Sequence, residues 1–219
     1  MTLKKSLLII VVVLLVDQLS KIYIKTHFVL GDSIDVLSWF KILFIENSGA
    51  AWGAKLSDFL PISEPVGKLI LTVFRLFAVG GIGYWLYDTI KKNSTRTLIL
   101  AVSLIFAGAV GNIIDSVFYG VIFSDSYQEV ATAFSSEPYG GFFHGKVVDM
   151  LYFPIIDTRW PDWVPYLGGS TFRFFEPVFN IADMAISTGV GILIVFNKKA
   201  FGKKEDHAIE EEYQTNQKE

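Results

Sequence analysis

Hydrophobic residues gather into four long runs along the chain, separated by polar or mixed segments. A helix needs about 20 mostly apolar residues to cross a hydrocarbon core roughly 30 Å thick. Four stretches reach or nearly reach this length: 6–23, 66–87, 97–122 and 178–196. The pattern therefore predicts an all-α membrane protein with four transmembrane helices.

Two long connections, 24–65 and 123–177, join the predicted spans. The first contains short runs typical of β-strands, at 34–36 and 39–45, which predict a small sheet at the membrane surface. The second is rich in glycine, proline and aromatic residues. Neither resembles an independent domain, so we expect a single membrane domain over 1–219, with extended loops and a disordered acidic tail from about 203 to 219.

Basic residues mark the ends of the predicted spans and set their orientation. They are Lys4 and Lys5 before the first span, Lys91, Lys92 and Arg96 between the second and third, and Lys198, Lys199, Lys203 and Lys204 after the fourth. Both termini are therefore expected in the cytoplasm and both long connections on the outer side. The first span is expected to remain as a helix, because no small-residue cleavage site follows it and Asp17 interrupts the apolar run.

The composition supports the membrane assignment and narrows the chemistry. Hydrophobic residues make up 52% of the chain and the mean hydropathy is +0.44. The absence of cysteine excludes disulfides, thiolate zinc sites and a cysteine nucleophile. The three histidines have no metal-ligand spacing, and no Gly-x-Ser-x-Gly elbow occurs. We expect no metal, no cofactor and no nucleic-acid partner.

Three aspartates lie within the predicted spans: Asp17, Asp115 and Asp183. A carboxylate inside a membrane costs several kcal/mol unless it meets partners or a polar cavity. At a rise of 1.5 Å per residue, all three fall roughly 7–11 Å below the outer surface. The spacing predicts a polar centre at this depth.

Neighbouring polar residues indicate a structural role for two of these aspartates. Lys21 follows Asp17 by four residues on the same helix face, which favours an ion pair between them. Asn112 precedes Asp115 by three residues and offers a similar partner. Buried hydrogen bonds of this kind also hold membrane helices together. We therefore expect Asp17 and Asp115 to be structural or positioning groups.

Asp149 lies outside the spans, in an apolar segment before the fourth. Burial against Val147, Val148 and Met150 would raise its pKa, and a second carboxylate nearby would raise one pKa of the pair further. Asp183, with Asn180 three residues before it, is the candidate partner. Two such carboxyls can share one proton, so that one activates water and the other polarises a peptide carbonyl. This is the chemistry of aspartic peptidases.

Two other functional classes also fit intramembrane carboxylates. A small proton-coupled transporter or channel would carry them as proton relays, although such proteins usually show internal repeats and broken helices, and neither is visible in this sequence. A purely structural membrane protein would leave the common depth of the aspartates unexplained.

Five motifs follow one another in a fixed order on the four-span frame. They are Asp17-Gln18-x-Ser20-Lys21, Glu46-Asn47-Ser48-Gly49-Ala50-Ala51-Trp52-Gly53, Gly111-Asn112-x-x-Asp115, Val147-Val148-Asp149 and Phe179-Asn180-x-Ala182-Asp183. In these motifs the chain resembles the lipoprotein signal peptidase (signal peptidase II) family over nearly its whole length. Any one motif alone would be weak, whereas five in order are specific.

The resemblance implies a peptidase of the bacterial inner membrane, with its active site near the outer face. It implies cleavage of prolipoproteins just before a diacylglyceryl-modified cysteine, with Asp149 and Asp183 as the catalytic pair. The implied supporting residues are Asp17, Lys21, Asn47, Gly49, Asn112, Asp115, Asn180 and Ala182. The implied partners are these prolipoproteins and membrane lipid, and a monomer is expected.

Two features depart from the family pattern. Ser116 stands where the family has a basic residue, which leaves the partner of Asp115 open. Insertions at 117–146 and 158–176 lengthen the second outer connection. They are expected either to cap the outer opening or to contact the substrate.

Overall fold

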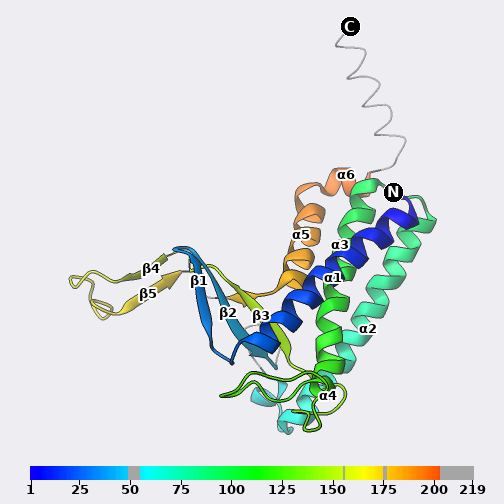
Figure 1. The fold of residues 1–219 in the computed structure, drawn as a ribbon. Helices are drawn as coiled ribbons and strands as arrows, with labels where there is room; N and C mark the ends of the chain where they lie inside the picture. Colours follow the sequence, from blue (N-terminus) through cyan, green and yellow to red (C-terminus); the bar gives the residue numbers. More distant parts are fainter. Residues whose placement is uncertain (49–54, 155, 175–176, 203–219) are drawn as a thin grey trace. The chain divides into compact units, whose positions relative to one another are not determined.

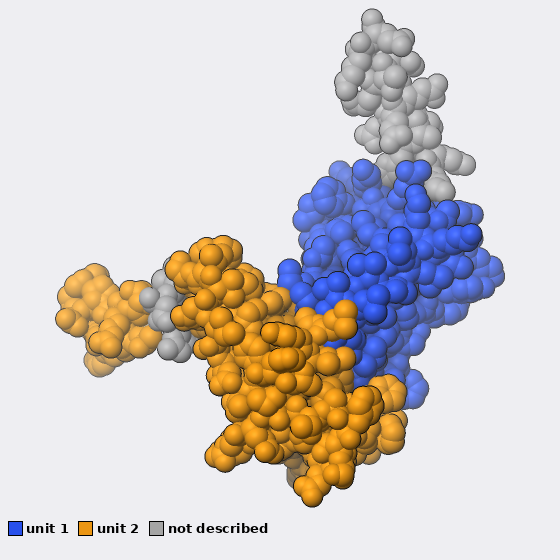
Figure 2. All heavy atoms as spheres, viewed as in Figure 1, with its two compact units in different colours: residues 1–18, 72–114, 181–219 blue, residues 19–71, 115–180 orange. Residues whose placement is uncertain are grey.

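The computed structural model describes residues 1–48, 55–154, 156–174 and 177–202, and its described part is mostly helical with a small antiparallel sheet (Figure 1). Contacts divide the chain into two compact units, coloured separately in Figure 2. Unit 1 comprises 1–18, 72–114 and 181–219, and unit 2 comprises 19–71 and 115–180. Gly49 and the acidic tail lie outside the described residues.

The long apolar runs form helices with nearly the predicted bounds. Helix α1 covers Leu3–His27, α2 covers Glu64–Lys91, and α3 covers Arg96–Ile114. A π-helical turn, Asp115–Tyr119, and the short helix α4, Gly120–Ile122, continue α3. By length and hydropathy α1, α2 and the stretch Arg96–Ile122 can each cross a membrane.

The fourth apolar helix is shorter than predicted. Helix α5 covers Ile181–Val195, and helix α6 follows over Asn197–Phe201. Val178 and Phe179, which the hydropathy pattern assigned to the span, form strand β6 instead, because they pair with a neighbouring strand. The structure thus has three helices of membrane-spanning length and one shorter apolar helix among its described residues.

Close packing of α3 against α5 dominates unit 1. Gly108 and Gly189 lie where the two helices approach most tightly, since an added Cβ would come within 2.2 Å of Ala182 O and 2.6 Å of Ala101 O, respectively. Small residues allow membrane helices to approach in this way. A buried hydrogen bond of 2.7 Å between Ser6 and Ser103 joins α1 to α3.

Unit 2 is built around a four-stranded sheet in the order β1-β2-β3-β6, with all pairs antiparallel. Its strands are β1 (Ser33–Leu37), β2 (Phe40–Asn47), β3 (Val147–Tyr152) and β6 (Val178–Phe179). The strand runs predicted in the first connection are therefore confirmed. Strand β3, which carries the Val-Val-Asp motif, was not predicted as a strand. The core of this unit includes Phe44 and Val148, which are both fully buried.

The second connection has more regular structure than its composition predicts. Strands β4 (Ile156–Arg159) and β5 (Thr171–Phe174) pair antiparallel, so most of this hairpin lies in the insertion 158–176. The unit also contains a short 3-10 helix, η2, over Leu56–Asp58.

Candidate active site

Strand β3 carries Asp149 into a buried position in unit 2, where its side chain is 4% exposed. Pairing with β2 fixes its place, because Ile45 lies opposite Asp149 and Asn47 lies opposite Val147. Asn180 donates a 2.7 Å hydrogen bond from Nδ2 to Asp149 Oδ1, and Asn47 Nδ2 lies 3.5 Å from Oδ2. Two of the predicted supporting asparagines therefore contact this carboxylate.

In unit 1, Asp183 lies in the first turn of α5 and is half-buried. Asn112 of α3 donates a 2.7 Å hydrogen bond from Nδ2 to Asp183 Oδ1. The sequence assigned this amide to Asp115, three residues away on the same helix. The contact with Asp183 was missed because it connects residues that are 71 positions apart in the chain.

Asp17 is fully buried in unit 1 and acts on the backbone of α5. Its Oδ1 accepts a 2.9 Å hydrogen bond from the Ala182 N–H, one of the unpaired donors at the start of that helix. Gln18 donates to Asp17 Oδ2 at 3.0 Å, and an added Cβ at Gly111 would lie 2.6 Å from the same oxygen. Asp17 thus contacts the helix turn that carries Asp183.

Asp115 of unit 2 has a lysine partner that the sequence assigned elsewhere. Lys21 Nζ lies 2.8 Å from Asp115 Oδ2, and both side chains are fully buried. The same oxygen accepts a 3.3 Å hydrogen bond from the Val148 N–H. Lys21 therefore supplies a basic partner although Ser116 stands where the family has one, and Asp115 holds the strand that carries Asp149.

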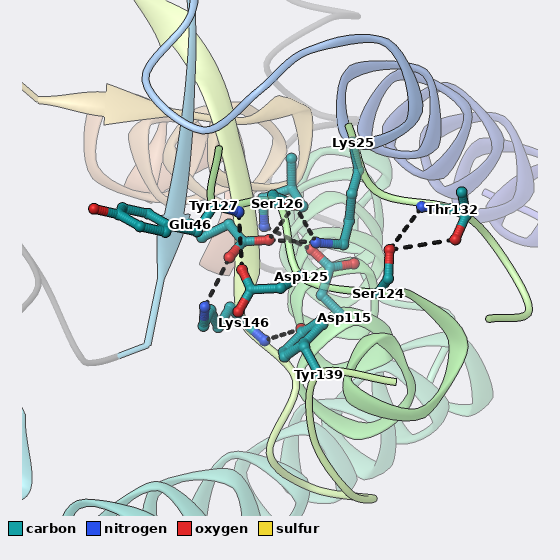
Figure 3. A network of polar contacts seen from close by, with 11 residues as sticks. Lys25, Glu46, Asp115, Ser124, Asp125, Ser126, Tyr127, Thr132, Tyr139 and Lys146 are labelled. Carbon is teal, nitrogen blue, oxygen red and sulfur yellow. Dashed lines mark hydrogen bonds and ion pairs between the residues drawn. The ribbon is translucent and has the colours of Figure 1, made fainter. Parts of the chain in front are cut away.

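Behind strand β2, Glu46 lies in a second buried polar cluster, shown in Figure 3. Its Oε1 pairs with Lys25 at the end of α1, and its Oε2 lies 2.9 Å from Lys146 Nζ. Burial alone would raise the pKa of the Glu46 carboxyl, but the ammonium groups of Lys25 and Lys146 together hold this pKa below its usual value. Ser126 completes the cluster by accepting from Lys25 at 2.8 Å and donating to Glu46 at 3.1 Å.

The sequence predicted no role for this cluster. Glu46 was recognised only as part of a motif, and no role was predicted for Lys25 or Lys146. Strand alternation could have indicated the cluster. Neighbouring side chains in a strand point to opposite faces of the sheet, so Glu46 must point to the face opposite to that of Asn47.

The later part of the insertion 117–146, from Gly140 to Gly145, is hydrogen-bonded back to the π-helical turn and to Gly120 at the start of α4. Backbone amides of Gly140, Phe143 and Gly145 donate to the carbonyls of Gly120, Val117 and Ser116 at 2.9–3.0 Å. An added Cβ on Gly145 would lie 1.9 Å from Asp115 O. This insertion is thus packed against the segment that carries Asp115.

Among the described residues, no three histidine, cysteine, aspartate or glutamate side chains lie together in a way that could hold a metal ion. Each unit instead holds two of the candidate carboxylates, Asp17 and Asp183 in unit 1 and Asp115 and Asp149 in unit 2, with amide, lysine or backbone donors around them. Buried carboxylates of this kind on a frame of apolar helices define a multi-pass membrane protein with candidate aspartic chemistry.

Comparison with known proteins identifies the family. The model of the family described as "Signal peptidase (SPase) II" matches residues 9–198. The lipoprotein signal peptidase of Porphyromonas gingivalis is 47% identical over 189 residues, covering 85% of this chain and 80% of that protein. That of Amoebophilus asiaticus is 36% identical, covering 84% and 73%. The chain belongs to the signal peptidase II family of aspartic peptidases, which act in lipoprotein processing.

Solved structures agree with this assignment. A bacterial membrane enzyme determined by the in meso method at 1.9 Å resolution is 27% identical, with a TM-score of 0.57, covering 88% of this chain and 92% of that one. The chain is thus a multi-pass membrane protein of a kind typical of the bacterial inner membrane. The comparisons give no support to a transporter or channel.

Proposed function

We propose that this protein removes the signal peptides of diacylglyceryl-modified prolipoproteins, cutting just before the lipidated cysteine, and that Asp149 and Asp183 are its catalytic pair. The observation that carries this proposal is that each of the two aspartates accepts a 2.7 Å hydrogen bond from an asparagine amide, Asn180 for Asp149 and Asn112 for Asp183. Amide donors orient a carboxyl group without adding a full positive charge.

The chemistry follows from two carboxyls that share one proton. The ionised member accepts a proton from a water molecule, which attacks the scissile carbonyl carbon. The protonated member gives its proton to the carbonyl oxygen. The first member then passes the proton that it took from water to the leaving amine, and the second member regains a proton from a hydroxyl of the tetrahedral intermediate as the C–N bond breaks. In this scheme Asp17 and Asp115 position the two catalytic elements and carry out no proton transfer.

We also propose four membrane spans, with both termini in the cytoplasm and the active site near the outer face. Helix α5 has 15 residues, about 22 Å at the α-helical rise, which is shorter than a core of roughly 30 Å. A short span is accommodated by local thinning of the bilayer. The basic residues Lys91, Lys92 and Arg96 between α2 and α3 favour a cytoplasmic location for that connection. The protein is expected to act as a monomer in contact with membrane lipid.

The catalytic proposal is tested with Asp149→Asn, Asp183→Asn and the double variant, using a diacylated prolipoprotein and an unlipidated one. We expect the wild type to cut only the lipidated substrate and each single variant to lose activity. Residues that act as a unit are non-additive, so the double variant should be no worse than either single one. Asp35→Asn, in the exposed part of β1, is the matched control and should cleave normally. Near-normal turnover by Asp149→Asn would exclude the pair.

Topology is tested separately, because the chain has no cysteine and each introduced thiol is therefore unique. Tyr127→Cys in the second connection and Ser94→Cys between α2 and α3 are treated in whole cells with a membrane-impermeant maleimide. We expect labelling of the cysteine at position 127 in intact cells, and labelling at position 94 only after lysis. The opposite pattern would reverse the proposed orientation.

A further inference from the structure

Glu46 is a buried acid on the opposite side of β2 from the residues that contact Asp149. In the β2–β3 register, Asn47 lies opposite Val147, Glu46 opposite Val148, and Ile45 opposite Asp149. Because side chains alternate between the two faces of a sheet, Asn47 and Asp149 share one face while Glu46 projects from the other. Glu46 is therefore the side chain that anchors β2 from behind, directly beside Asn47.

The end of α1 and the insertion 117–146 both reach Glu46 of β2, as Figure 3 shows. Lys25 comes from the end of α1, and Ser126 and Tyr139 come from the insertion 117–146. Lys146 immediately precedes β3. Lys146 reaches Glu46 through its ammonium group at 2.9 Å, and its backbone N–H donates to the Tyr139 hydroxyl at 2.8 Å. The cluster therefore joins Lys146, which precedes β3, to Glu46, which precedes Asn47 in β2.

Two lysines surround one glutamate, so the charges of the cluster depend on one another. The ammonium groups of Lys25 and Lys146 lie 4.7 Å and 5.1 Å from the centre of the same Tyr139 ring. Aromatic faces attract cations, but a neutral residue in place of Glu46 would leave two like charges close together in a buried place. In such a variant we expect Lys146 to move away from Lys25, because Lys146 is the more exposed of the two lysines. Lys146 is also the residue that leads directly into the Val147-Val148-Asp149 strand.

From this geometry we infer that Glu46 is a positioning residue for the catalytic end of the sheet, and that it acts through Asn47 to hold the Asp149 carboxyl in place. The insertion 117–146 is then part of the brace behind the active site. This inference rests on the proposed role of Asp149, although the stability of the cluster can be measured without it.

The test is a double-mutant cycle between Glu46→Gln and Asn47→Ala in the full-length protein in detergent. Each single change is expected to lower kcat roughly 10- to 100-fold, the scale of a small misplacement of a catalytic group, with KM changed less than about threefold. A hydrogen bond to a charged carboxylate favours the charged form, so both variants should move the acid limb of the kcat profile to higher pH. The double variant should show little further loss and no further shift, because both changes remove the same restraint.

Two further variants control for folding and charge. Lys146→Met perturbs the cluster at its more exposed end and should shift the acid limb in the same direction, with a loss of roughly three- to tenfold in kcat. Asp35→Asn makes the same chemical change as Glu46→Gln at the exposed Lys41–Asp35 pair of the same sheet, and both kcat and the pH profile should stay unchanged.

The possible results separate the inference from the proposed catalytic pair. A lower melting temperature for Glu46→Gln, with an unchanged kcat and pH profile, would show that the cluster only stabilises the fold. Fully additive effects of Glu46→Gln and Asn47→Ala would show that Glu46 does not act through Asn47. Either result overturns the inference while leaving the catalytic pair intact, whereas full activity of Asp149→Asn overturns the pair itself. If Glu46→Gln does not fold, Lys146→Met decides by the same criteria.

Discussion

Replacing Gly108 with alanine should separate two helices at the point where one of them carries Asp183. An alanine Cβ at this position would lie 2.2 Å from Ala182 O and 2.7 Å from a carbon of Ile186. Nonbonded atoms of this kind prefer to stay about 3.5 Å apart. Helices α3 and α5 must therefore move apart by roughly 1 Å, or the backbone around Ala182 must shift by a similar amount.

The expected size of the effect follows from one hydrogen bond. Asn112, one helical turn after Gly108, donates to Asp183 at 2.7 Å, and a displacement of roughly 1 Å lengthens this contact beyond hydrogen-bonding range. Misplacement of a catalytic group by this amount costs on the order of 10²-fold in rate. Overpacking should also lower the free energy of unfolding by about 1–3 kcal/mol.

Gly191→Ala is the matched control, because Gly191 lies on helix α5, which packs against the helix of Gly108, and an added Cβ there has no atom within 4 Å. Alanine is the better helix former, so this variant should keep full activity and gain up to about 1 kcal/mol in stability. Both variants are compared by cleavage of lipidated prolipoprotein and by thermal unfolding in detergent. Equal activity and equal melting temperatures would show that the tight α3–α5 approach does not restrain Asp183.

Other changes test the charged groups. Lys21→Met should lower the free energy of unfolding by roughly 3–5 kcal/mol, because it leaves the buried Asp115 without its lysine. Adding Asp115→Asn should recover part of that loss. An unchanged melting temperature of Lys21→Met in detergent would contradict this. The folded pKa of Glu46 lies below its unfolded value of 4.5, so its stabilising contribution is complete above pH 4.5 and is lost as pH falls through the lower folded pKa. The difference in melting temperature between wild type and Glu46→Gln should therefore shrink below pH 4.5, and a constant difference down to pH 3 would refute the role of the charge.

The apolar runs were enough to predict the helices, because length and hydropathy decide whether a segment can cross a bilayer. The predicted start of the fourth span was wrong by three residues, since Val178 and Phe179 pair with β3. Both residue types are common in strands as well as in apolar spans, so hydropathy cannot separate the two. Strand β3 was missed for a similar reason: a short apolar run carries no clear period, and only its neighbours β2 and β6 define it.

Candidate residues were easier to predict than their partners. Each aspartate could be found from the cost of placing a carboxylate among apolar residues. Partners were sought three or four positions away on the same helix, which is the range that sequence spacing can address. The partnerships of Lys21 with Asp115 and of Asn112 with Asp183 instead connect different elements, and their residues are brought together only by the packing of the fold.

Different kinds of hydrogen-bond donor contact Asp115 and the proposed catalytic pair. Asp115 is paired with a lysine and a backbone amide, and these contacts suit a structural tie. Asp149 and Asp183 accept hydrogen bonds from asparagine side chains, whose dipoles fix orientation but stabilise the anion less than a lysine does. An aspartic peptidase needs one carboxyl of its pair to hold a proton at neutral pH. The amides of Asn112 and Asn180 can orient the two carboxyls for the proposed chemistry.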